Sequence, residues 1–130
     1  MSVVVDASAI VELLLRTQKG QRLERRLLAA GRMLNAPHLI DVEVAQVMRR
    51  YVRLGDIDQA RARVNLDLLA ALPLQRHAHG FLMNRAWELR DNFTAYDAMY
   101  LALAEALGLP LVTCDAKLAG GGHTAQIELA

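Results

Sequence analysis

Two aspartates each follow a short apolar run that predicts a buried β-strand. Asp6 ends the run "SVVVD", and Asp115 ends the run "LPLVTCD". Ligands of parallel sheets bind beyond the carboxyl ends of the strands, so the two carboxylates are expected at the same edge of one sheet. An aspartate after a strand is also a common helix N-cap. Neither residue taken alone therefore identifies a site.

A third aspartate lies in the segment "FTAYDAMYLALAEALG", where the only other charged residue is Glu105. The segment predicts a helix that is apolar on nearly every side and hence packed on more than one face. A buried carboxylate needs a raised pKa, an arginine partner or a bound cation. The helix dipole offsets only about 0.3 to 1 kcal/mol of that cost. Burial of Asp97 therefore predicts a counter-charge beside it.

A fourth acidic residue is expected on the predicted helix "LIDVEVAQVMRR". At about 100° per residue, Asp41 and Glu43 flank its apolar stripe from opposite sides. Helical periodicity does not choose between them.

The elements that would position these acids alternate between strand and helix. Strands are expected at 2–6, 32–37, 74–78 and 109–115, with a last edge strand at 125–130. Amphipathic helices fill the intervals, and Ser8 is the expected N-cap of the first one. This alternation predicts an α/β fold with a parallel sheet. Phe81, Trp87 and Phe93 occupy apolar helical positions and are expected in the core.

Composition narrows the class of protein. The chain has 130 residues, which suits one domain, and no apolar run reaches the roughly 18 to 20 residues of a membrane span. The first residues lack the basic start of a signal peptide, so a cytoplasmic protein without a membrane contact is expected. The only cysteine, Cys114, excludes an internal disulfide or a zinc site of several thiolates, and it is expected to be an inert core thiol.

Four fragments in this order resemble the PIN-domain family, and among its members the VapC toxins of bacterial toxin–antitoxin pairs. The motifs are D-x-S in "VVVDASAIV", P-x5-E-V in "APHLIDVEVAQVMRR", T-x-Y-D-A in "FTAYDAMYLALAEALG", and L-x-T-x-D in "LPLVTCDAKL". The resemblance covers nearly the whole chain. The family places its second acid six residues after the proline, which matches Glu43 and leaves Asp41 as a surface or cap residue. The glycine-rich "LAGGGH" after Asp115 is less typical of the family.

The resemblance implies a single PIN domain over residues 1–130. Its expected fold is a three-layer α/β/α sandwich around a mainly parallel sheet of four or five strands. It also implies a site, with Asp6, Glu43, Asp97 and Asp115 as catalytic and metal-binding acids and Ser8 and Thr113 as polar neighbours. Carboxylate oxygens without thiolates suit Mg²⁺, with Mn²⁺ as a substitute, and support metal-assisted hydrolysis of a phosphodiester.

The implied function is a Mg²⁺-dependent endoribonuclease that acts as a toxin. Its implied partners are single-stranded or loop RNA, a VapB-like antitoxin, and a second copy in a homodimer or a larger assembly. Arg49, Arg50 and Arg53 lie near the acidic residues of the predicted helix that contains Glu43 and are candidates for binding the RNA backbone. Two alternatives stay open at this stage: a non-catalytic PIN-like binding scaffold, and a receiver-type signalling domain with acids at its strand ends.

Overall fold

Five parallel strands form the centre of the molecule. The structure is a computed structural model that describes residues 1–130. The strands are β1 (Ser2–Val5), β2 (Met33–Pro37), β3 (Leu74–His77), β4 (Leu111–Thr113) and β5 (Ile127–Leu129). They pair in the order β3-β2-β1-β4-β5, and every pairing is parallel. All five expected strands are present, and the sheet is wholly rather than mainly parallel.

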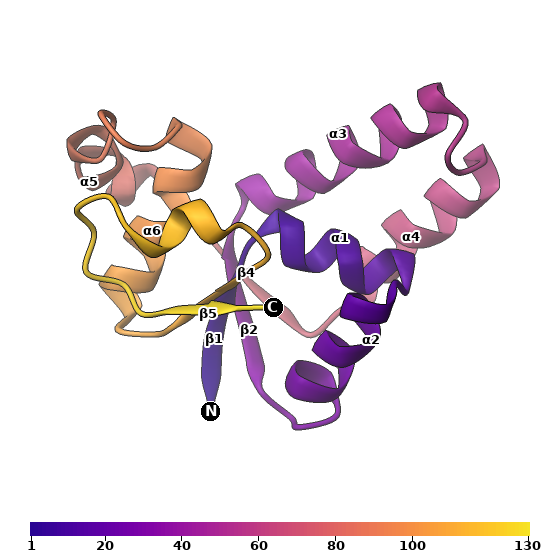
Figure 1. Cartoon of the computed structure of the whole chain (residues 1–130), viewed down its shortest axis with the longest axis horizontal. Coiled ribbons are helices and arrows are strands. Elements are labelled where there is room, and N and C mark those ends of the chain that lie inside the picture. Colours follow the sequence, from indigo (N-terminus) through magenta and orange to yellow (C-terminus); the bar gives the residue numbers. More distant parts are fainter.

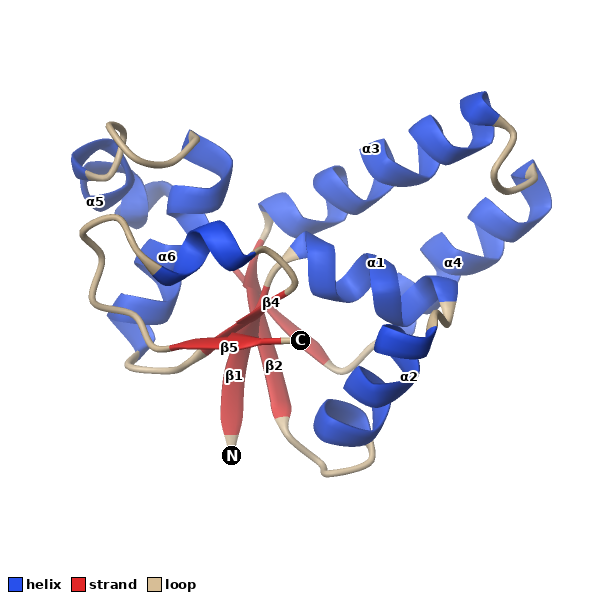
Figure 2. Cartoon of the chain, in the orientation of Figure 1, coloured by secondary structure: helices blue, strands red, loops and turns tan.

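Helices cover both faces of this sheet and give the expected three layers (Figures 1 and 2). On one side lie α1 (Ala7–Leu15), α2 (Gln18–Leu23), α3 (Leu39–Leu54) and α4 (Gln59–Ala71); on the other lie α5 (Met83–Glu88) and α6 (Ala95–Leu107). The shorter turns are π-helical at Glu24–Leu28 and 3₁₀-helical at Gly80–Leu82 and Ala116–Ala119. No helix is both long and apolar enough to cross a bilayer.

The strand order also decides against a receiver domain. Receiver-type folds of the flavodoxin-like class have the order 2-1-3-4-5, with the third strand beside the first. Here β4 lies beside β1, and β3 is at the far edge next to β2. The switch point of this sheet therefore falls between β1 and β4, where Asp6 and Asp115 follow their strands.

The hydrophobic core lies on both faces of β1 and under α6. Val3, Val4 and Val5 are fully buried, because the helical layers leave neither face of the central strand in water. In α6 every residue from 98 to 104 is buried, and the helix contacts strands β1, β2 and β4 as well as α5. The expectation that this helix packs on several faces is confirmed.

Two local expectations are wrong. The N-cap of α1 is Asp6, whose side chain accepts a hydrogen bond from Ala9 N, while Ser8 lies inside the helix. Phe81 and Trp87 are not in the core, since 67% of each side chain is exposed. The segment instead buries Leu82, Ala86 and Leu89, so the two aromatics lie on its solvent-facing side.

Candidate active site

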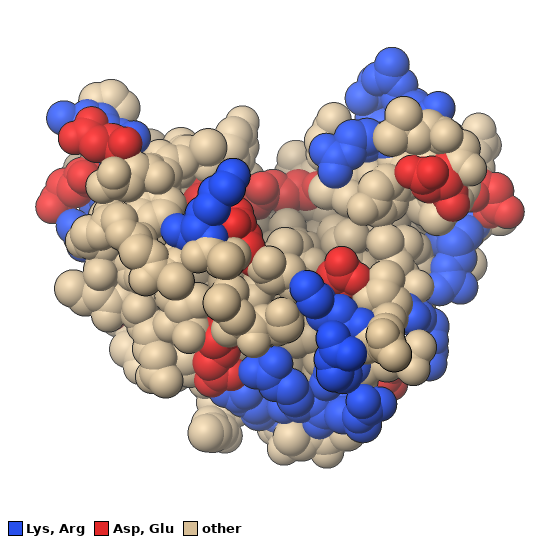
Figure 3. Space-filling view, in the orientation of Figure 1, with Lys and Arg blue, Asp and Glu red and all other residues tan.

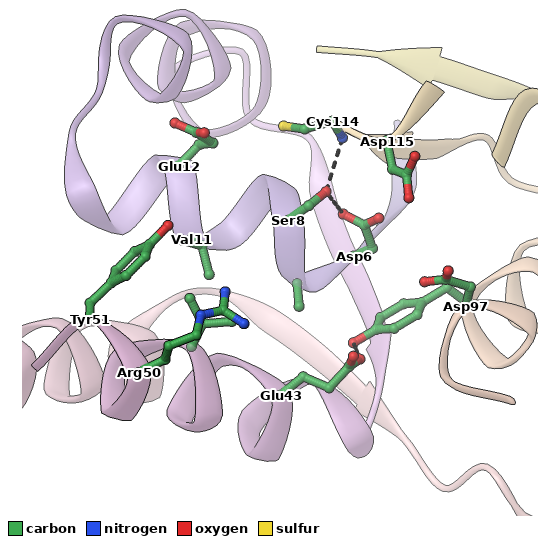
Figure 4. Close-up of a pocket in the computed structure, with 13 residues that line it drawn as sticks. Asp6, Ser8, Val11, Glu12, Glu43, Arg50, Tyr51, Asp97, Cys114 and Asp115 are labelled. Atoms are coloured by element: carbon green, nitrogen blue, oxygen red, sulfur yellow. Dashed lines mark hydrogen bonds between the residues drawn. The ribbon is translucent and has the colours of Figure 1, made fainter. Parts of the chain in front are cut away.

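The four predicted acids line one pocket at the carboxyl edge of the sheet, although they come from four separate segments. The cavity has a volume of about 320 Å³, and we call it the acidic pocket. Its charged and polar lining comprises Asp6, Ser8, Glu12, Glu43, Arg50, Tyr51, Asp97, Tyr100, Cys114 and Asp115 (Figure 4). In the space-filling view, acidic side chains lie at the bottom of the hollow between the α5–α6 side and α3 (Figure 3).

Asp6 is the most constrained of the four. Only 5% of it is exposed, and its carboxylate accepts hydrogen bonds from the Ser8 hydroxyl at 2.6 Å, from the Thr113 hydroxyl and from Ala9 N at 3.1 Å. Burial raises the pKa of Asp6, the charge of Asp115 raises it further, and the three hydrogen bonds oppose the rise. These donors fix the direction in which the carboxylate faces the pocket.

Ser8 and Thr113 connect the end of β1 to the end of β4. The Ser8 hydroxyl donates to Asp6 and accepts from Cys114 N at 3.0 Å (Figure 4). The Thr113 hydroxyl accepts from Asp115 N at the same distance. Asp115 caps the following 3₁₀ turn by accepting from Lys117 N at 3.0 Å. The two strand-end acids are therefore held by one hydrogen-bonded network. Cys114, expected in the core, is only partly buried and lines the pocket.

Asp97 is placed in the pocket by the start of α6. Thr94 is the N-cap and accepts from Asp97 N at 3.1 Å, which orients the first turn toward the pocket. The side chain is half-buried rather than enclosed by its apolar helix, and none of the ion pairs involves it. Burial raises the pKa of Asp97, and the charges of Asp115 and Asp6 raise it further.

The structure separates Glu43 from Asp41. Asp41 forms a two-pronged ion pair with Arg76, at 2.7 and 2.9 Å, outside the acidic pocket. Glu43 faces the pocket and accepts a hydrogen bond from the Tyr100 hydroxyl at 2.6 Å. Burial raises the pKa of Glu43, the Tyr100 hydroxyl opposes this rise, and Asp97 and Asp6 add to it.

Sequence reasoning missed three polar residues of the pocket, namely Glu12, Tyr51 and Tyr100. Tyr100 lies one turn after Asp97 on α6 and is 1% exposed, so its position in an apolar run gave no sign of its contact with Glu43. Glu12 lines the pocket from α1, where Thr17 donates to its carboxylate. Its i+4 spacing from Ser8 was the available signal. Arg50, already a candidate for binding RNA, is the single cation in this lining.

The donor atoms of the acidic pocket suit a hard divalent cation. All the candidate ligands are carboxylate oxygens, and three of them have pKa values that are raised partly by their neighbours' charges. No three acidic, histidine or cysteine side chains are close enough to hold an ion by themselves. The residues therefore fit an ion that keeps several water ligands, as Mg²⁺ does, better than an ion that needs a closed protein cage.

Comparisons with known proteins agree with this fold and pocket. A model of the PIN domain family matches residues 3–120. Ribonuclease VapC12 of Mycobacterium tuberculosis is 42% identical over 128 residues, and the match covers 98% of each chain. A structure of VapBC2 from Rickettsia felis bound to a fragment of promoter DNA matches with a TM-score of 0.74 at 15% identity, over 98% of each chain. A toxin–antitoxin complex from Klebsiella pneumoniae matches with a TM-score of 0.64 at 19% identity, over 92% of each chain.

Proposed function

The chain belongs to the PIN-domain family, and from this premise we propose that it is a metal-dependent endoribonuclease and the toxin of a toxin–antitoxin pair. One observation carries the proposal: carboxylates from four separate segments line a single pocket at the switch point of the sheet. The 42% identity to a relative named as a ribonuclease supports RNA as the substrate. We propose residues 1–130 as one PIN domain that acts in the cytoplasm.

Asp6, Asp97 and Asp115 are the proposed ligands of the ion, with Asp115 acting directly or through water. A bound Mg²⁺ would supply positive charge for the phosphate oxygens and lower the pKa of a water. Ser8 and Thr113 hold the Asp6 carboxylate in place, which is the support that metal ligands commonly receive. The protein thus provides a fixed set of oxygen donors on one side of the substrate.

Glu43 is the proposed base or water-mediated ligand. Its raised pKa makes it a better proton acceptor than an ordinary glutamate, and the Tyr100 hydroxyl fixes its orientation. In the proposed reaction the water oxygen attacks phosphorus and Glu43 accepts the proton of that water. The phosphorus–oxygen bond to the ribose breaks, and the departing ribose oxygen takes a proton from solvent water.

The proposed partners are a VapB-like antitoxin and a second copy of the chain. The fold match to a toxin–antitoxin complex supports the former, and the exposed apolar residues on α4 are compatible with the latter. Arg49, Arg50 and Arg53 remain candidates for contacts with the RNA backbone. A non-catalytic scaffold is the alternative function, and it predicts binding without cleavage.

The experiment is cleavage of total RNA by the purified protein in Mg²⁺, in EDTA, and after Mg²⁺ is added back. We expect mapped internal cuts that disappear in EDTA and return with the ion. Asp6→Asn and Asp97→Asn should abolish them. The matched control is Asp91→Asn, because Asp91 is exposed and lines none of the larger cavities. Cuts that persist in EDTA and in both pocket variants would refute the proposal.

A further inference from the structure

A second cavity opens directly beside the acidic pocket. It has a volume of about 510 Å³, and we call it the side groove. Glu43, Val47 and Arg50 line both cavities, so the two adjoin along α3. The other wall of the side groove is Tyr96, from the first turn of α6. A molecule lying across the carboxylates can therefore continue into this groove.

The side groove presents apolar surface to solvent beside two of the proposed catalytic acids. Tyr96 is 59% exposed and precedes Asp97, while Val42 is 69% exposed and precedes Glu43. The Tyr96 hydroxyl has no hydrogen-bond partner, whereas that of Tyr100, one turn away, is bonded to Glu43. Tyr96 is not part of the hydrophobic core, and its exposed aromatic ring lies beside the acidic pocket.

Arg50 supplies the only positive charge on the groove. It is exposed, forms no ion pair in spite of the nearby acids, and lies 5.9 Å from the centre of the Tyr51 ring. In Figure 4 its guanidinium lies between Glu43 and Tyr51. A free guanidinium is suited to two-pronged binding of a phosphate. The groove therefore pairs an aromatic face with an anion-binding group.

We propose that the side groove binds the nucleotide next to the bond that is cut in single-stranded RNA. Its base stacks on Tyr96 and contacts Val42, and Arg50 binds its phosphate. Only unpaired bases expose a face for stacking, so this contact selects single strands and loops over duplex. The inference rests on the proposed function, since it places this nucleotide relative to the acidic pocket.

A second copy of the chain is the other occupant that an exposed apolar groove could take. The observations favour RNA, because the groove adjoins the acidic pocket and carries an arginine that forms no ion pair. Gln46 adds a hydrogen-bonding group to the same wall. An apolar protein surface in the groove would offer the Arg50 guanidinium no anion to pair with. An RNA phosphate would pair with it directly.

The test is the kinetics of a short single-stranded RNA with Tyr96→Ala, Tyr96→Trp and Trp87→Ala. We expect Tyr96→Ala to raise KM by roughly 10- to 100-fold with kcat little changed, and Tyr96→Trp to retain wild-type KM. Trp87→Ala removes an aromatic on α5 that is at least as exposed as Tyr96, and it should change neither constant. An unchanged KM in Tyr96→Ala would overturn the inference.

Arg50→Ala gives an independent measure. Binding of the same RNA should weaken and lose about one unit of its salt slope, while Arg22→Ala, an exposed arginine of α2, should keep the slope. Light scattering on each variant tests the other occupant, because a loss of dimer that tracks the rise in KM would assign the groove to a second copy. Absence of cleavage by the wild type would refute the proposed function instead. In that case, comparing the RNA affinity of wild type and Tyr96→Ala by fluorescence anisotropy would still show whether the groove binds RNA.

Discussion

Replacing Glu105 by glutamine is expected to destabilise the fold far more than an ordinary surface mutation. Glu105 accepts two hydrogen bonds from the Arg85 guanidinium, at 2.7 and 3.0 Å, and two from Thr124, at 2.7 Å from its N and 3.1 Å from its hydroxyl. It thereby joins α6 to α5 and to the segment before β5. These contacts lower the pKa of Glu105 to about 2, with the Arg85 guanidinium as the largest cause.

The magnitude follows from the change in pKa. A fall from 4.5 to about 2 corresponds to roughly 3.4 kcal/mol at neutral pH, at 1.36 kcal/mol per pKa unit. Only 13% of the Glu105 side chain is exposed, but solvent reaches 33% of Arg85 and screens the pair. We therefore expect Glu105→Gln to lower the free energy of unfolding by about 1 to 3 kcal/mol at pH 7.

The dependence on pH has a definite sign. Because the folded pKa is below the unfolded value, the contribution is complete above about pH 4.5 and is lost as the pH falls toward 2. The difference between wild type and variant should thus shrink by more than half between pH 7 and pH 3. Urea unfolding followed by circular dichroism at both pH values measures it.

Glu88→Gln is the matched control for this measurement. Glu88 pairs with the same Arg85 but at 3.5 Å, and 63% of its side chain is exposed, so its loss should cost less than about 0.5 kcal/mol. If Glu105→Gln costs no more than Glu88→Gln at pH 7, or if its cost is the same at pH 3, the account of this ion pair is wrong.

Two further predictions concern the acidic pocket, and a third concerns the packing of α2 against α1. In EDTA, Asp97→Asn should raise the melting temperature by about 2 to 5 °C, because it removes a half-buried charge among like charges. Mg²⁺ should then stabilise the variant less than it stabilises wild type. Scanning fluorimetry with and without the ion measures both effects. Tyr100→Phe removes a hydrogen bond that lowers the pKa of Glu43, so the acid limb of the pH–rate profile should move to higher pH, and a limb that stays in place would refute the role of Glu43. Gly20→Ala should cost roughly 2 to 4 kcal/mol in urea unfolding, since its Cβ would lie 1.9 Å from a backbone oxygen of α1, while Gly80→Ala has open space and should cost less than about 1 kcal/mol.

Sequence patterns predicted the parts of the structure that follow from strand ends and helix faces. Asp6 and Asp115 could be placed together because parallel strands share a carboxyl edge, and the sheet confirms that placement. The apolar α6 was predicted to pack on several faces, and it does. These predictions succeeded because each depends on a local period combined with one rule of topology.

The remaining features depend on contacts between distant segments. Arg76, on β3, pairs with Asp41 and holds it away from the pocket. The periodicity of α3 alone could not predict this contact with another element. Trp87 was predicted to be a core residue because its spacing suits a helix face, but the structure leaves it 67% exposed. Tyr100 occupies a buried apolar position in which only the hydroxyl, at the far end of the ring, reaches Glu43.

The hydrogen bonds of Asp6 have a consequence for the order in which the protein is made. The Asp6 carboxylate is held by Ser8, which is synthesised two residues later, and by Thr113, which is synthesised 107 residues later. β1 likewise pairs with β4 only after the intervening helices have been translated. A ribosome-bound chain that has not yet reached β4 therefore has neither the Thr113 hydroxyl nor Asp115 at the pocket. The nuclease site is not assembled until this strand has been translated.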